Sequence, residues 1–247
     1  MNKLTEFLKE EQQAKRKGGL YHKTQVQLAY NSNRIEGSKL TEEQTRYIFE
    51  TRTIGFKDQE AVPVDDIIET SNHFIAFDDV LRTIDEPLTE DLIKGVHRTL
   101  KTGTADAQLS YFNVGDYKKL ANEVGGRETC MPAAVAMEMK SLQEWYNAQK
   151  NVTIHTLAEY HWRFESIHPF QDGNGRVGRL ILFRECLRNN IMPFVIDNEH
   201  KIYYYRGLSD FKQTPGFLVG TMQSAQDVYE AWIRYFNEEL LEGLKIE

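Results

Sequence analysis

The chain has 247 residues and a mass of 28.8 kDa, with 40% hydrophobic and 27% charged residues, a composition typical of a folded, soluble protein. A formal net charge of -7 at pH 7 argues against a broad basic surface of the kind that binds nucleic acid or anionic membranes. The amino terminus lacks the apolar core of a signal peptide, and no apolar run is long enough to cross a bilayer, so we expect a cytoplasmic protein.

Helical periodicity dominates the chain, and no linker or repeat divides it, so we predict a single domain. Apolar residues recur at three- and four-residue spacing in 64–84 and 90–100. Thr41 and Thr89 are typical helix-capping residues, and Pro132 suits the first turn of a helix. The predicted helices cover about 22–35, a segment starting after Thr41, 64–84, 90–100, 132–149, 153–167, 176–188, 202–212 and 217–243.

The segment 111–131 departs from the helical pattern. Gly125 and Gly126 lie between short segments that contain Val and Thr, which is typical of a two-residue hairpin turn. The predicted fold class is therefore all-α with one small β-hairpin.

The segment 168–179, HPFQDGNGRVGR, carries the strongest indication of chemistry. Gly173, Asn174 and Gly175 end a loop that enters an apolar helix. Free main-chain N–H groups and the positive end of the helix dipole therefore meet at one point, which suits a phosphate group.

The charged residues of the same segment indicate a metal-bound polyphosphate. Arg176 and Arg179 lie about one helical turn apart on one face, and Asp172 supplies a hard oxygen ligand for Mg²⁺. His168 lies just upstream, and a neutral imidazole can accept a proton from an attacking hydroxyl at neutral pH.

These residues resemble the signature of the Fic family, H-P-F-x-[D/E]-G-N-[G/K]-R, and every specified position is met from His168 to Arg176. The resemblance covers most of 21–212 and implies a compact all-α core with a β-hairpin flap. Within the single domain 1–247, it implies an inhibitory helix region at about 21–40, a catalytic core at about 64–212 and a C-terminal helix at 213–247.

Fic proteins typically transfer AMP from ATP to a Ser, Thr or Tyr hydroxyl of a target protein. The resemblance therefore implies an ATP-using, Mg²⁺-dependent protein adenylyltransferase in which His168 is the general base and Asp172 holds the metal. The phosphate-binding roles that it implies are Asn174 with the loop N–H groups of Gly173 and Gly175 for the α-phosphate, Arg176 for the β-phosphate and Arg179 for the γ-phosphate.

Two further segments resemble substrate-binding parts of the family. Residues 121–126 resemble the flap, whose edge aligns an extended segment of a target protein by main-chain pairing. Tyr205, and less closely Tyr204, resembles the aromatic position of the adenine pocket. The alternative for the tyrosines is that they only cover the core.

A local motif upstream indicates self-inhibition. Residues 32–37, SNRIEG, match the family's inhibitory pattern [S/T]-x-x-x-E-[G/N] at the end of a predicted helix. Ser32 and Glu36 are four residues apart and share a helix face. We expect Glu36 to pair with Arg179 and to occupy the room of the γ-phosphate; the alternative is a plain helix end capped by Gly37.

Several alternatives stay open from the sequence. The glutamate supports removal of AMP in some relatives, and a nucleotide-binding regulatory module without turnover would carry the same motif. Some members of the family transfer UMP, phosphocholine or a γ-phosphate instead of AMP, and Gly175 in place of Lys argues against the phosphate-transferring variant. The spacing of His155, His161 and His168 does not suit a metal site on one helix. An apolar stripe from Trp232 to Leu240 favours core packing, with a homodimer as the alternative.

Overall fold

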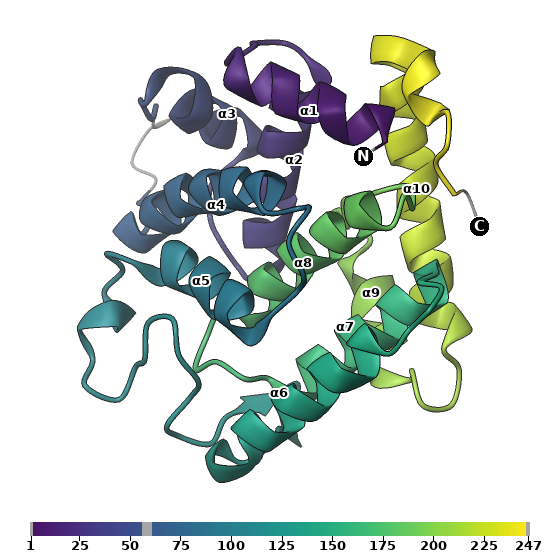
Figure 1. Ribbon diagram of the computed structural model, residues 1–247. Helices are drawn as coiled ribbons and strands as arrows, with labels where there is room; N and C mark the ends of the chain where they lie inside the picture. Colours follow the sequence, from purple (N-terminus) through teal and green to yellow (C-terminus); the bar gives the residue numbers. More distant parts are fainter. Residues whose placement is uncertain (1, 56–60, 246–247) are drawn as a thin grey trace.

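The computed structural model describes residues 2–55 and 61–245, and helix α8 (Asn174–Arg188) lies at its centre (Figure 1). The apolar residues of α8 run without interruption from Leu180 to Phe183, so the helix has no face for solvent and nearly all of it is buried. The helices packed most extensively against α8 are α2 (Leu20–Ile35), α4 (Val64–Arg82), α5 (Glu90–Lys101) and α7 (Ile154–Ile167).

The other elements surround this centre. The remaining helices are α1 (Lys3–Gln13), α3 (Glu42–Thr51), α6 (Pro132–Asn147), α9 (Lys201–Ser209), α10 (Gly216–Asn237) and the short 3-10 helices η1 (Asp106–Gln108) and η2 (Glu238–Leu241). Strands β1 (Glu123–Val124) and β2 (Arg127–Glu128) form an antiparallel hairpin in which Val124 pairs with Arg127. The prediction of a mostly helical fold with one small hairpin at Gly125 and Gly126 is confirmed.

The capping residues act as the sequence predicted. Thr41 and Gln44 form a reciprocal capping box at α3, with main-chain to side-chain distances of 3.1 and 2.9 Å. The predicted helix over 217–243 is wrong at its end, because α10 stops at Asn237. There the chain becomes extended, and the side chain of Asn237 accepts a hydrogen bond from the N–H of Glu239, which starts η2 instead.

Helix α1 was not predicted from the sequence. Asn2 caps its first turn by accepting a hydrogen bond from the N–H of Thr5 at 2.8 Å. Leu4 and Leu8 are fully buried against the rest of the fold. Because most of its other residues are polar, α1 owes its stability to this tertiary burial.

One apolar cluster runs through the fold from Leu4 to Leu240 and includes the C-terminal stripe. Ile233 is fully buried, and Trp232 packs against the same cluster, whereas Tyr235 is 82% exposed. The stripe therefore serves the chain's own core, and a homodimer stays a prediction.

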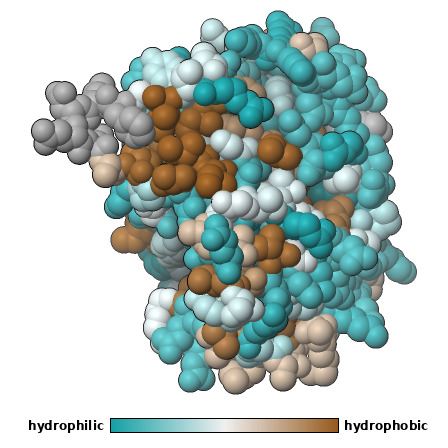
Figure 2. Space-filling view, turned by 90° about the vertical axis from the view of Figure 1, so that its left-hand side faces the viewer, coloured by the Kyte–Doolittle hydropathy of each residue, from teal (hydrophilic) through white to brown (hydrophobic). Residues whose placement is uncertain are grey.

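The face shown in Figure 2 is largely hydrophilic, with apolar side chains gathered mainly in one brown area in its upper half. Of the helices in 2–55 and 61–245, none is both long and apolar enough to cross a membrane.

Candidate active site

The loop between α7 and α8 has two positions with positive φ. His168 ends α7 in the left-handed conformation, with φ 52° and ψ 62°, and Gly173 precedes α8 with φ 81°. A left-handed residue is rare for a non-glycine side chain and turns the chain sharply, so His168 projects from a bent corner between the helices. Phe170 lies between these two positions and is fully buried, which fixes the loop to the core.

Asn174 shapes this loop. Its side-chain oxygen accepts a hydrogen bond from the N–H of Phe170 at 2.8 Å, and its amide nitrogen donates to the carbonyl of Phe170 at 2.9 Å. Both ends of the amide are therefore used on the main chain, although the resemblance gave this residue a phosphate contact. The group of Asn174 that can still bind a phosphate is its main-chain N–H at the start of α8.

His97 of α5 supports this loop through hydrogen bonds and ring stacking. It was not identified from the sequence as a residue of the site. Its Nδ1 accepts a hydrogen bond from the N–H of Gly115 at 2.9 Å, so the proton lies on Nε2, which donates to the carbonyl of Asp172 at 3.1 Å. The ring stacks on Phe170 with centroids 4.0 Å apart. The sequence feature that could have indicated His97 is its position, as a histidine, on the apolar face of the helix predicted over 90–100.

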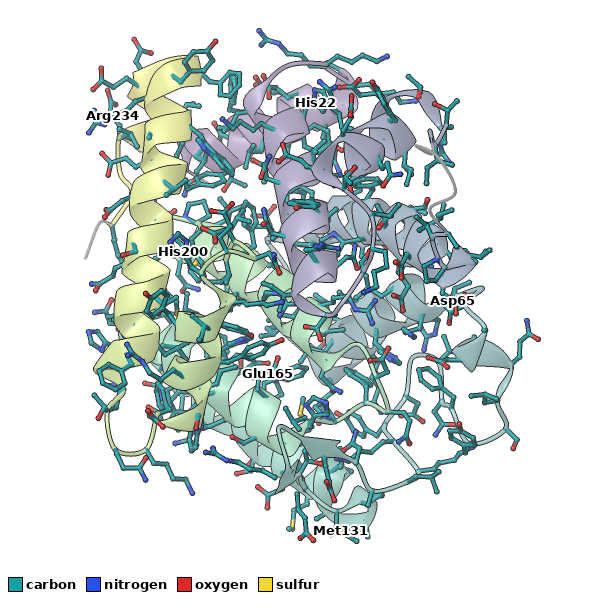
Figure 3. All side chains as sticks on the ribbon, turned by 180° about the vertical axis from the view of Figure 1, so that it is seen from behind. His22, Asp65, Met131, Glu165, His200 and Arg234 are labelled. Carbon is teal, nitrogen blue, oxygen red and sulfur yellow. The ribbon has the colours of Figure 1, made fainter. Side chains whose placement is uncertain are left out.

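The imidazole of His168 is partly covered, with 16% of its side chain exposed. Burial and the nearby charge of Lys118 lower its pKa to about 4, so the ring is neutral at pH 7 and can accept a proton. Nδ1 is buried, which leaves Nε2 as the nitrogen for chemistry. Glu165, in the middle of the molecule in Figure 3, lies 3.8 Å from Nδ1, and burial raises the pKa of its carboxyl to about 8.

Asp172 belongs to a cluster of charges at the first turn of α8. Its Oδ2 lies 2.7 Å from Nζ of Lys101 and 2.9 Å from Nη2 of Arg176. Glu69 of α4 pairs with both cations. Lys101 is only 2% exposed and Arg176 is buried, so the two cations are desolvated and are balanced by the two carboxylates. The sequence reading missed Glu69 and Lys101, although Lys101 continues the apolar face of its helix.

The chemistry of Asp172 fits Mg²⁺. Arg176 and Lys101 hold the pKa of its carboxyl well below the usual range, and nearly half of its side chain is exposed. Mg²⁺ binds through one or two carboxylates together with phosphate oxygens and water. The described residues contain no group of three or more His, Cys, Asp or Glu side chains that could hold a metal alone. A magnesium ion would therefore reach Asp172 with the phosphates of a nucleotide.

Arg179 is paired with the end of α2. Its Nη2 lies 2.7 Å from Oε1 of Glu36 and 2.9 Å from the carbonyl oxygen of Ser32, and its Nε donates to Oγ of Ser32 at 3.0 Å. The guanidinium is buried, and Glu36 raises its pKa further. The predicted pair of Glu36 with Arg179 is thus present, and Ser32 shares the same partner.

Glu36 also touches the glycine-rich turn. A Cβ built on Gly175 would lie 2.3 Å from Oε1 of Glu36, which is too close for any side chain. The carboxylate therefore lies directly against the first turn of α8, where the helix dipole favours an anion. In this state Glu36 occupies the place where the sequence reading puts a phosphate.

The two tyrosines of α9 differ in their surroundings. Tyr204 is 1% exposed, and its hydroxyl lies 2.7 Å from Nε2 of His161. Tyr205 is half-exposed and donates a hydrogen bond to the carbonyl of Ile35 at 3.2 Å. Of the two, only Tyr205 presents a ring surface to solvent, and an adenine role for it stays a prediction.

Three buried histidines make stability depend on pH. Burial lowers the pKa of His73, His97 and His161 to about 3 each, so all three are neutral in the fold. In the unfolded chain they bind protons near pH 6.5, so the free energy of unfolding falls as pH drops below that value, by up to about 4 kcal/mol per pH unit for the three together. Urea unfolding at pH 7, 6 and 5 measures this slope. His161→Gln removes one of these groups and should lower the slope by up to about 1.4 kcal/mol per pH unit; an unchanged slope would contradict the expectation.

Comparisons with known proteins show which proteins the chain resembles. Residues 87–185 match the profile of the family described as Fic/DOC. The chain is 28% identical over 215 residues to the protein adenylyltransferase Fic of Drosophila melanogaster, and 27% identical over 221 residues to that of Culex quinquefasciatus. The matches cover 81% and 83% of this chain, but the chain spans only 41% of the length of each relative.

Solved structures share the fold. A Fic domain containing signaling protein from Bacteroides thetaiotaomicron superposes with a TM-score of 0.72 at 23% identity, covering 99% of this chain and 98% of that one. Fic-1 from C. elegans gives a TM-score of 0.67 at 22% identity, covering 87% of this chain and 64% of that one. Residues 87–185 thus match the Fic/DOC family, and over 215 residues the chain is similar to the protein adenylyltransferases Fic.

Proposed function

We propose that this chain is a protein adenylyltransferase that is held in an inhibited state by Glu36. The observation that carries the proposal is the position of the Glu36 carboxylate, paired with Arg179 at 2.7 Å and in contact with Gly175. An anion already lies at the helix terminus that suits a phosphate, and a neutral imidazole lies at the other end of the same loop.

The reaction transfers AMP from ATP to a hydroxyl of a target protein. The hydroxyl oxygen attacks the α-phosphorus while Nε2 of His168 takes its proton, and the bond from the α-phosphorus to the bridging oxygen breaks to release pyrophosphate. Nδ1 of His168 is buried, 3.8 Å from Glu165, so Nε2 is the nitrogen that would take the proton. The rate then depends mainly on positioning and on groups that oppose the developing negative charge.

The first turn of α8 would hold the triphosphate. Its free N–H groups and Arg176 would contact the α- and β-phosphates, and Arg179 the γ-phosphate. Bound Mg²⁺, held by Asp172, would neutralise phosphate charge and orient the leaving group. Arg176 and Asp172 are already fixed by Lys101 and Glu69, so these residues need little rearrangement.

Inhibition follows from competition for Arg179. A γ-phosphate needs the guanidinium that Glu36 occupies, and two anions at one buried cation repel each other. ATP would then bind with its phosphates displaced from the line of attack. Glu36 keeps 31% of its side chain exposed, so a water molecule can reach it, and removal of AMP by hydrolysis is the second candidate function.

Intact-mass spectrometry tests the proposed chemistry. Wild type and Glu36→Gly are incubated with ATP and Mg²⁺, and Glu36→Gly is expected to gain the mass of one or more AMP groups by self-modification. The same variant with His168→Ala should gain none. A gain of phosphate alone would contradict AMP transfer, and no gain with α-labelled ATP and added protein substrates would favour a binding module. Release of AMP from modified protein only while Glu36 is intact would favour the hydrolytic function.

A further inference from the structure

Lys118 lies between the hairpin and the catalytic loop, and only 3% of its surface is exposed. Its ammonium group has three N–H donors, and each finds an acceptor. The acceptors are Oδ1 of Asn122 at 2.7 Å, Oγ1 of Thr129 at 2.6 Å and the carbonyl of Ile167 at 3.4 Å. No ion pair joins Lys118 to a carboxylate within 2–55 and 61–245, so this buried charge is balanced by hydrogen bonds alone.

These acceptors connect two functional segments. Asn122 and Thr129 flank the hairpin, one on each side of its strands, and Ile167 directly precedes His168. The main-chain N–H of Lys118 also donates to the carbonyl of Pro169 at 2.9 Å. Asn122 in turn donates from its amide to the carbonyl of Phe170 at 3.0 Å. The residues at the base of the hairpin are therefore hydrogen-bonded to the catalytic loop through Lys118 and also through Asn122.

The strands and the turn of the hairpin make few other contacts that could fix their position. Residues 123–128 are all exposed, so they bury no apolar surface that would fix them. At the tip, Arg127 donates hydrogen bonds to the carbonyl and the hydroxyl of Ser209, at 3.1 and 2.6 Å, but both side chains are exposed. Exposed contacts of this kind contribute little, whereas buried hydrogen bonds from a charged group contribute more.

We propose that Lys118 is a positioning residue that fixes the hairpin relative to His168, and thereby sets how an extended segment of a target protein is presented to the base. The inference rests on the proposed function for its catalytic consequence, but the anchoring itself does not. The charge of Lys118 is consistent with the assignment, because burial lowers the pKa of His168 most and Lys118 lowers it further.

Hydrogen–deuterium exchange tests the anchor without any reaction. Lys118→Met keeps the length and the apolar stem of the side chain but removes all three donors. Exchange in the peptides that cover 118–129 is expected to become at least about tenfold faster than in wild type. Lys119→Met is the matched control, because that neighbouring lysine is exposed and makes one long contact, of 3.4 Å, to Ser110. Unchanged exchange in Lys118→Met, or equal loosening in Lys119→Met, would overturn the anchor.

A second measurement tests the catalytic consequence in the Glu36→Gly background. Label from α-labelled ATP on the protein itself is expected to fall at least about tenfold with Lys118→Met, while the dissociation constant for ATP changes less than about twofold. Lys118→Arg should restore part of the label, since a guanidinium supplies donors to the same acceptors. Equal losses of label and of ATP affinity would refute positioning and indicate a general structural role. If Glu36→Gly itself carries no label, the proposed function fails, and the exchange experiment still decides whether Lys118 anchors the hairpin.

Discussion

Replacing Glu36 with glycine is expected to raise the initial rate of AMP incorporation at least about 30-fold. The carboxylate holds Arg179 at 2.7 Å and lies against Gly175, so it must leave before a γ-phosphate can bind in the same place. Truncating one partner of a buried charge pair costs about 2–5 kcal/mol. Because Glu36 is 31% exposed, the lower end applies, and 2 kcal/mol corresponds to about a 30-fold change in an equilibrium. The check is the initial rate of label transfer from α-labelled ATP, together with the dissociation constant for ATP by calorimetry.

The same substitution should lower the stability of the nucleotide-free protein. Arg179 is buried and would lose its ion pair while keeping its hydrogen bonds to Ser32, so we expect a loss of about 1–3 kcal/mol in the free energy of unfolding. Added ATP should restore it by supplying a new anion. Glu36→Gln, which keeps the size but not the charge, should give an intermediate rate. An unchanged or lower rate in Glu36→Gly would refute self-inhibition.

Replacing His168 with alanine in the Glu36→Gly protein is expected to reduce AMP transfer by more than about 10²-fold, the usual contribution of a positioned general base. Affinity for ATP should change little, because none of the ion pairs at Arg176 and Arg179 involves the imidazole. With its pKa lowered to about 4, the base stays unprotonated from pH 8 down to about pH 5. The rate of the active protein should therefore be flat across that range with respect to His168, and should fall below it.

His155→Ala is the matched control for the loss of a histidine, because His155 lies exposed at the start of the same helix α7. It should leave the rate within about twofold of its parent, as exposed substitutions away from special contacts have small effects. Retained label transfer in the His168→Ala protein would remove His168 from the mechanism. A rate that begins to fall near pH 6.5 would show that the site does not lower the pKa of this residue.

Local sequence rules predicted most of the secondary structure. The capping box at Thr41, the first-turn proline at Pro132 and the two-glycine hairpin turn all lie where the sequence places them, because each depends on neighbours within a few residues. Helix α1 escaped this reasoning, since its burial depends on contacts with elements far along the chain. The end of α10 was also misplaced, because Asn237 competes with the helix through its own side chain.

The candidate site divides in the same way. The motif from His168 to Arg179 revealed the residue types for a phosphate-binding turn, because loop and helix are contiguous. Lys101 and Lys118 gave no such signal, although each is buried beside the loop. Their partners lie on other elements. Because lysine is rarely buried, the sequence predicts an exposed residue unless those partners are known.

By itself, the sequence determined the helical pattern, the turn into α8 and the chemical groups at that turn, because these properties are set within one or two helical turns of chain. Only the tertiary structure decided that Glu36, 143 residues away from Arg179, lies on it, that Asn174 is used by the loop, and that Lys118 joins the hairpin to the base. Which distant groups meet is fixed by how the helices pack around α8, since a buried charge is stable only where the completed fold supplies its partners.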